Sequence, residues 1–302
     1  MNMIQENDKS CFQFTGIPSV KLLQQIFHWI KLATKKLKLW DGKKKLHAEG
    51  KSFRRKRKAM TLLEEFVLTL VRIRRGYDVA LLVYQFGITT SQVVRVATAW
   101  INFLAKCFKP LIKWPTKDNV KGNLPASFNS FPRTKVIIDC TEIYVEKAFR
   151  PTAQRATWST CKHSNTFKLL VGIMPSGAIT FVSKLYSGCI SDQNTVEKSG
   201  FLDVIERNDD VMADRGFNII HLLLPKGATL NIPSFSHGKR LSKKAVTRSM
   251  KIATVRIHVE RAIRRMKTFR ILSGVIPIRL RFQLDQIITI VSVLCNLQKR
   301  LA

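Results

Sequence analysis

Three acidic residues stand out in a very basic chain because of where they occur in the apolar pattern. Asp139 ends one apolar run, Asp214 ends another, and Glu260 lies on a basic helical stretch. In open α/β sheets, carboxylates at strand ends meet at the edge where such sheets bind ligands. Three carboxylates that meet there repel one another unless cations bridge them, and hard divalent ions prefer oxygen ligands. The pattern therefore predicts a site for Mg²⁺ or Mn²⁺.

Such a site would perform phosphodiester chemistry. Two divalent ions about 4 Å apart activate a water or a 3′ hydroxyl and stabilise the leaving oxygen of an in-line displacement. In this interpretation the three carboxylates are metal ligands rather than the acid and the base. The alternative for each is a structural salt bridge, because Arg215 follows Asp214, and Arg256 and Arg264 lie one turn from Glu260.

The charge of the chain indicates the partner. Among 302 residues, 52 are Lys or Arg and 20 are Asp or Glu, which gives a formal net charge of +32. A surface of this kind neutralises phosphates, so double-stranded DNA is the expected partner, and the alternative is a basic surface with no specific ligand. Apolar residues make up 45% of the chain, enough for a large core.

Other classes of protein fit the sequence less well. The longest apolar run, 287–295, is about half the length that a membrane span needs. Residues 1–10 are polar and include Glu6 and Asp8, so we expect no secretory signal and an intracellular protein. The six cysteines are scattered singly, which favours neither a zinc finger nor a disulfide framework. No aromatic platform of the kind that RNA-binding modules use is visible on the expected strands.

The first part of the chain is expected to be helical. Apolar spacing predicts helices over 20–30 and 62–73, the second capped by Thr61 and ended by Gly76. Two further helices, 78–86 and 91–108, flank a short turn that contains Gly87, which is the layout of a helix-turn-helix. Between the first two helices, residues 35–58 form a basic stretch, interpreted as an exposed linker that is either a solvated arm or a nuclear import signal.

Beyond residue 132 the pattern changes to strands followed by helices. Strands are expected at 136–139 with an extension over 143–145, and at 167–174, 178–185 and 211–213. A long helix follows from Ser242 to about Phe269, and a last helix covers 282–297. The predicted fold class is α/β, with an N-terminal helix and basic linker at 1–60, a helix-turn-helix region at 61–131, and a mixed-sheet catalytic domain at 132–302.

Several motifs resemble those of a known family. They are VIIDCTEI at 136–143, WSTCK at 158–162, VMADRGF at 211–217 and RIHVERAI at 256–263. These stretches resemble the DDE superfamily endonucleases, and within them the Harbinger-like transposases of the subgroup that often carries a THAP zinc finger. The resemblance implies a ribonuclease-H-like core, metal-dependent DNA cleavage and strand transfer in the nucleus, and Asp139, Asp214 and Glu260 as the catalytic metal-binding triad.

The chain also departs from that subgroup. The cysteines and histidine of a THAP finger are absent from the N-terminal region, so recognition of a specific DNA end would need another source. A homo-oligomer and a separate DNA-binding partner protein both remain open. The alternative function is a catalytically inactive, domesticated DNA-binding protein that keeps the fold.

A few further residues carry weaker expectations. Trp158, Lys162, Asn165 and Lys168 are candidates for DNA contact, although a tryptophan before a strand is more often part of a core. His258 precedes Glu260 by two residues, so we expect it to face away from the metals and to be a packing or surface residue. Asp192 is either a supporting acidic residue or part of a helix cap.

Overall fold

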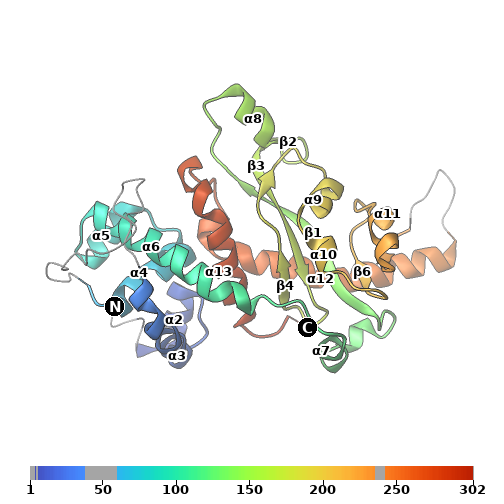
Figure 1. The fold of residues 1–302 in the computed structure, drawn as a ribbon, viewed down its shortest axis with the longest axis horizontal. Helices are drawn as coiled ribbons and strands as arrows, with labels where there is room; N and C mark the ends of the chain where they lie inside the picture. The colour runs from blue at the N-terminus through green and yellow to red at the C-terminus, as the bar shows by residue number, and fades with distance from the viewer. Residues whose placement is uncertain (1–3, 5, 38–59, 235–241, 302) are drawn as a thin grey trace. The chain divides into compact units, whose positions relative to one another are not determined.

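The computed structural model describes residues 4, 6–37, 60–234 and 242–301. The chain divides into two compact units (Figure 1), the first made of Met1–Pro110 with Phe269–Ile271, the second of Leu111–Thr268 with Leu272–Ala302. The division therefore falls after Pro110, and nearly all of the predicted catalytic stretch 132–302 belongs to the second unit. The predicted basic linker lies, from residue 38 onward, outside the described residues.

The described part of the first unit is helical. Its helices are α2 (Asp8–Thr15), α3 (Val20–Lys31), η1 (Leu32–Lys36), α4 (Leu62–Arg75), α5 (Val79–Phe86) and α6 (Thr90–Phe108). The four helices expected from apolar spacing are confirmed, and α2 was not foreseen. Its N-cap Asn7 and C-cap Gly16 are readable signals, but the short segment between them has little apolar periodicity.

Side-chain caps explain where these helices begin and end. Thr61 and Glu64 form a capping box at the start of α4, and Thr89 and Gln92 form another at the start of α6. Gly87 ends α5 in the left-handed conformation, with φ of 62°. A glycine adopts this conformation without strain, so the tight turn between α5 and α6 follows directly from the sequence.

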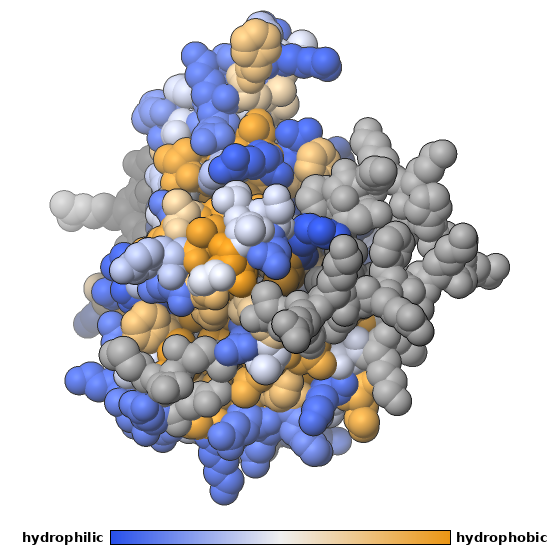
Figure 2. All heavy atoms as spheres, turned by 90° about the vertical axis from the view of Figure 1, so that its left-hand side faces the viewer, coloured by the Kyte–Doolittle hydropathy of each residue, from blue (hydrophilic) through white to orange (hydrophobic). Residues whose placement is uncertain are grey.

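The first unit has its own core, centred on aromatic side chains. Trp100 is fully buried on α6, and its ring lies 5.6 Å from that of Phe66 on α4. Its indole Nε1 donates a 2.9 Å hydrogen bond to Glu65, which is itself buried. Figure 2 shows hydrophobic atoms gathered among hydrophilic ones on the face at the left of Figure 1. Leu32 of this unit is 81% exposed, so the surface of the unit is not uniformly charged.

The second unit is built around a mixed sheet. Its strands are β1 (Thr134–Tyr144), β2 (Trp158–Ser159), β3 (Ser164–Ile173), β4 (Ile179–Val182), β5 (Tyr186–Ser187), β6 (Asp210–Met212) and β7 (Thr229–Asn231). The strand order is β2-β3-β1-β6-β7, with β4 and β5 paired to β3. β1 runs antiparallel to β3 and parallel to β6, and β6 runs parallel to β7. The predicted strands are confirmed in position, whereas the two-residue strands and β7 were not predicted.

Helices surround the sheet. They are α7 (Lys117–Gly122), η3 (Ala126–Phe128), α8 (Pro151–Thr157), α9 (Asp192–Lys198), α10 (Phe201–Val204), α11 (Ile220–Leu223), η4 (Leu224–Lys226), α12 (Lys243–Lys267), η6 (Ile278–Gln283) and α13 (Leu284–Asn296). α12 packs on β1 and β3, and α13 packs on α12 and β4. The long and the last helix are confirmed within a few residues of their predicted ends.

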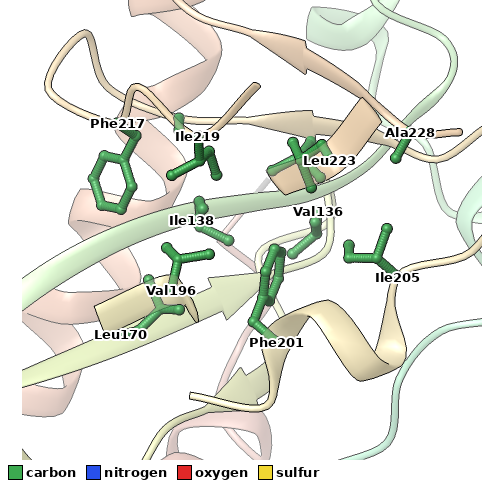
Figure 3. Packing of buried hydrophobic residues seen from close by; sticks show 12 residues of the cluster. Val136, Ile138, Leu170, Val196, Phe201, Ile205, Phe217, Ile219, Leu223 and Ala228 are labelled. Atoms are coloured by element: carbon green, nitrogen blue, oxygen red, sulfur yellow. The ribbon is translucent and has the colours of Figure 1, made fainter. Parts of the chain in front are cut away.

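The opposite face of the sheet carries a buried hydrophobic cluster. Val136 and Ile138 of β1 point into it, together with Val196 of α9 and Phe201 of α10 (Figure 3). Because side chains alternate along a strand, the intervening residues of β1, Asp139 among them, face the side that α12 covers. Packing of Val136 and Ile138 on one face therefore directs Asp139 toward the other.

One expectation about the strands is corrected. Asp139 does not end a strand, because β1 continues without a break to Tyr144 and Asp139 pairs with Val171 of β3. The polar residues of the sequence CTE that follow Asp139 obscure this continuity. Pairing with β3 continues from Ile137 to Tyr144, so strand structure extends beyond the apolar run.

Candidate active site

Asp139 and Asp214 lie at the same level of two adjacent parallel strands. Ile137 of β1 is in register with Met212 of β6. Asp139 follows Ile137 by two residues, and Asp214 follows Met212 by two. Because side chains alternate along a strand, both aspartates lie on the same face of the sheet. β6 has ended by Asp214, whose side chain is 49% exposed, whereas Asp139 is half-buried within β1. The conditional expectation that their strands are neighbours is thus met.

Glu260 approaches from α12 on the same face of the sheet. Six apolar residues of that helix are buried: Ile252, Val255, Val259, Ala262, Ile263 and Met266. Glu260 stands beside this stripe, and its side chain is 55% exposed. The predicted boundary position is therefore correct, but the carboxylate is more open to solvent than the sequence suggested.

Arg256 joins two of the three carboxylates. Its Nη1 lies 3.2 Å from Oδ1 of Asp214, and its Nη2 lies 3.4 Å from Oε1 of Glu260. The guanidinium is only 12% exposed, and its Nε has no hydrogen-bond partner among the described residues. The salt-bridge alternative considered for Glu260 is therefore present, and the same cation also holds Asp214.

Asp139 is electrostatically coupled to this group. Its pKa is raised from 3.8 to about 6. Burial is the largest cause, and the negative charges of Asp214 and Glu260 contribute in the same direction. The positive charge of Arg256 and a hydrogen bond from the Cys140 backbone act in the opposite direction. A carboxylate that is costly to ionise by itself, next to two others, is a group that an additional cation would stabilise.

A second cation, Lys267, lies near Asp139. Its ammonium donates a 3.1 Å hydrogen bond to the backbone carbonyl of Glu142. Burial and the charge of Lys162 lower its pKa, whereas Glu142 and Asp139 raise it. Sequence reasoning did not select Lys267, although spacings of four and seven residues put Arg256, Glu260 and Lys267 on one face of α12. That periodicity is the signal that could have found it.

The carboxylate oxygens of the site are suitable ligands for a divalent cation. The guanidinium of Arg256 already places a positive charge between two of these carboxylates, those of Asp214 and Glu260. Within the described ranges, no group of three or more His, Cys, Asp or Glu side chains is close enough to hold a metal ion directly. Carboxylate oxygens are the ligands that Mg²⁺ and Mn²⁺ prefer. Asp139, Asp214 and Glu260 are thus suitable ligands that would have to close around the ion.

The weaker candidates have structural roles or lie at the surface. Lys168 is buried, and its Nζ lies 2.9 Å from Oδ1 of Asp192. The ammonium of Lys168 is therefore engaged in an ion pair and is not available to contact DNA. Asn165 accepts a 2.9 Å hydrogen bond from Thr157. His258 is buried and stacks on Phe128, as the packing alternative predicts. Trp158, in contrast, is 44% exposed, so the expectation that it belongs to the core is wrong.

The helix-turn-helix presents a polar face of α6. Ser91, Arg95, Asn102 and Lys106 are exposed on that helix, whereas its other face is buried against α4 and α5. In this motif the second helix enters the major groove with its N-terminal residues toward the bases. Ser91 and Arg95 are in the first turns of α6 and suit that role.

Comparison with known proteins identifies the family. Residues 138–296, which include all three carboxylates, match the DDE superfamily endonuclease model. The chain belongs to the DDE superfamily endonucleases. Residues 58–110 match the helix-turn-helix of DDE superfamily endonucleases, which supports DNA binding by this endonuclease-family chain. The helical region followed by a mixed α/β sheet is the predicted fold and is consistent with a ribonuclease-H-like core.

Neither a curated protein nor a solved structure matches the chain significantly. In the part of the chain that the structure describes, no single helix is long and apolar enough to cross a membrane. The pair Val79–Phe86 and Thr90–Leu111 reaches that length and hydropathy only together, bent by 101°.

Proposed function

We propose that this chain is a transposase-type DNA endonuclease that cleaves phosphodiester bonds of duplex DNA and transfers the cut strand. The observation that carries the proposal is the level arrangement of Asp139 and Asp214 on adjacent parallel strands, with Glu260 facing them from α12. The family match supplies the reaction class, and the helix-turn-helix match supports duplex DNA as the substrate. The formal charge of +32 favours a polyanionic partner independently.

The three carboxylates would hold Mg²⁺ or Mn²⁺, as two ions in our proposal. When bound, the cations supply an activated water or 3′ hydroxyl and stabilise the leaving oxygen. Asp139 contributes the least solvated of the three carboxylates, which makes its charge the most dependent on a neighbouring cation. Glu260, on the helix, is the most exposed and so the easiest to move onto a ligand.

The basic residues of the site have separate roles in this proposal. Arg256 pairs with both Asp214 and Glu260, and these contacts would have to loosen for the two carboxylates to hold a metal ion. Lys267, held by the carbonyl of Glu142, places a positive charge beside Asp139. Such a charge stabilises the phosphate that undergoes displacement.

Finer assignments also belong to the proposal. The motifs favour the Harbinger-like subgroup whose relatives often carry a THAP finger, and we propose that the protein acts in the nucleus. Residues that could bind a specific DNA end would then lie on the exposed face of α6 or on a partner protein.

The experiment that tests the proposal is nicking of supercoiled DNA in the presence of Mn²⁺. Asp214→Asn should reduce the rate by roughly a hundredfold or more, because metal-ion stabilisation of a transition state amounts to several kcal/mol. Asp203→Asn, which alters an exposed aspartate of α10 in the same unit, is the matched control and should nick normally. Equal nicking by wild type and Asp214→Asn rejects the assignment.

One observation favours a second function, that of a DNA-binding protein without cleavage activity. Asp214 and Glu260 are both paired with Arg256, so these two carboxylates have a cationic partner without a metal ion. This alternative predicts salt-dependent duplex binding, no nicking with Mn²⁺ or Mg²⁺, and no heat of metal binding that the triple carboxylate variant loses.

A further inference from the structure

A basic concavity of about 870 Å³ lies on the second unit, away from the three carboxylates. It is bounded by the start of α12, the segment before β1, and strands β6 and β7. We call it the basic groove and define it by its charged lining: Arg133, Asp210, Lys243, Lys244, Arg248 and Lys251. We infer that the basic groove binds the phosphate backbone of duplex DNA outside the cleavage site.

The positive charges of the basic groove exceed the negative charge that its own lining supplies. Arg133 lies 3.4 Å from Asp210, the one acidic residue of the lining, and that carboxylate also accepts a hydrogen bond from Thr229. Arg248 donates a 2.8 Å hydrogen bond to the neutral amide of Asn231. Lys243, Lys244 and Lys251 have no ion-pair partner among the described residues, and all three are exposed. A ligand for this lining must therefore be anionic.

The position of these lysines on α12 also favours an anionic ligand. α12 begins at Lys243 after the N-cap Ser242, and its first turn contains no acidic residue. The N-terminal end of a helix carries a partial positive charge, so lysines there are unfavourable unless an anion is bound nearby. Phosphates are well suited to that position because free backbone N–H groups also point toward them.

The spacing of the basic residues favours a row of phosphates over a single one. Lys244, Arg248 and Lys251 are spaced by four and three residues, so they lie on one face of the helix and extend over ~10 Å of its axis. Arg133 adds a further charge from the segment before β1, on the other side of the concavity. A continuous nucleic-acid backbone contacts such a row, whereas a free phosphate contacts only part of it.

The basic groove and the carboxylates can contact one duplex. Asp210 precedes Met212 by two residues on β6, and Asp214 follows Met212 by two, so the groove opens on the same face of the sheet as the carboxylates. Along α12, Arg248 and Glu260 are twelve residues apart, which corresponds to ~18 Å, or roughly five base-pair steps. The groove would thus hold the backbone beside the bond that is cut. In naming the substrate, this inference relies on the proposed function.

The test compares two double variants in duplex-DNA binding without cleavage. Wild type, Lys244→Ala/Lys251→Ala and Lys198→Ala/Lys226→Ala are titrated with a labelled 30-base-pair duplex in EDTA, between 50 and 200 mM KCl. Lys198 and Lys226 are exposed residues next to the cluster on the opposite face of the sheet, so the second variant removes the same charge elsewhere. All altered side chains are exposed, so equal melting temperatures should verify the folds.

Removal of two phosphate contacts should make the slope of log K against log salt about 1.8 less negative. Over this salt range, the groove variant would then lose about twelvefold less affinity than wild type, while the control variant keeps the slope of the wild type. An unchanged slope in the groove variant, or an equal change in both variants, overturns the inference. A larger effect of the groove variant on duplex RNA than on duplex DNA overturns it as well.

Nicking of supercoiled DNA distinguishes this inference from the proposed function. A changed slope in a protein that never nicks supports the basic groove and rejects the endonuclease assignment. Normal nicking with an unchanged slope rejects the groove and leaves the endonuclease assignment standing.

Discussion

Arg256 has an unusual environment for an arginine beside a candidate metal site. Two of its nitrogens contact Asp214 and Glu260, whereas its buried Nε has no partner among the described residues. Because the Nε of Arg256 lacks a hydrogen bond within the described part of the chain and its two carboxylate partners are exposed, another cation can replace the arginine beside them. If the site binds metal as proposed, Arg256 would therefore compete with the metal ion for Asp214 and Glu260.

Substitution of Arg256 should accordingly strengthen metal binding. In Arg256→Gln, Mn²⁺ no longer competes with a guanidinium whose two ion pairs contribute about 1 kcal/mol, so the Mn²⁺ dissociation constant should decrease roughly fivefold. Isothermal titration of both proteins with Mn²⁺ measures this change. The exposed Arg261 supplies the control substitution Arg261→Gln, which should leave the constant unchanged. Weaker binding by Arg256→Gln would show that Arg256 supports the site instead of competing for it.

Asp139 should make the metal-free protein less stable at neutral pH. Its pKa is raised from 3.8 to about 6, so the contribution of this group is fully present below pH 3.8 and is lost as the pH increases through 6. Asp139→Asn avoids that loss and should be roughly 2–3 kcal/mol more stable at pH 7, with no such gain at pH 4.

Urea unfolding in EDTA at the two pH values measures the difference, and Asp203→Asn is the exposed control. An Asp139→Asn protein that is no more stable than wild type at pH 7 would contradict the raised pKa.

At this scale the sequence predicted part of the site. The sequence selected Asp139 and Asp214 but left open whether their strands are neighbours. The structure pairs β1 with β6, although Asp139 lies within its strand and not at its end. The double contact of Arg256 could not be predicted, because it depends on the distance between α12 and the end of β6. Lys267 could have been selected from its spacing on α12, but its contact with the backbone carbonyl of Glu142 could not have been read from the sequence.

The helix-turn-helix depends on glycines that end helices in the left-handed conformation. A Cβ added at Gly87, φ 62°, would have no neighbour within 4 Å, so Gly87→Ala should cost only the backbone strain of about 1 kcal/mol. At Gly76, also φ 62°, the added Cβ would lie 3.1 Å from the backbone of Arg270, so Gly76→Ala should cost more. Thermal melting ranks the two variants, and equal losses would contradict the steric argument.

Helices were predicted better than strands for a physical reason. Caps such as Thr61, Thr89 and Gly87 are local signals, and the structure confirms the helices that they delimit. Short strands such as β2, β5 and β7 exist because a longer neighbour offers hydrogen-bonding partners. Such pairing depends on residues far away in the sequence, so the local pattern carries little information about it.

The division into two units leads to a prediction for the whole molecule. Each unit has its own buried core, so unfolding need not be a single transition. All three carboxylates belong to the second unit, and Mn²⁺ should raise the melting temperature of that unit alone. Calorimetry with and without Mn²⁺, repeated with Asp214→Asn, tests this. A metal-induced shift that persists in Asp214→Asn would place the bound ions elsewhere.

The chain passes from the first unit into the second after Pro110 and returns for only three residues, Phe269–Ile271. Phe269 is fully buried there, its ring 4.7 Å from the guanidinium of Arg74 and within van der Waals distance of Gly16. A fragment truncated at residue 110 would lack the buried side chain of Phe269 and would expose the apolar space that it fills. A stable fragment of the helix-turn-helix unit should therefore need residues 269–271, supplied on a grafted linker.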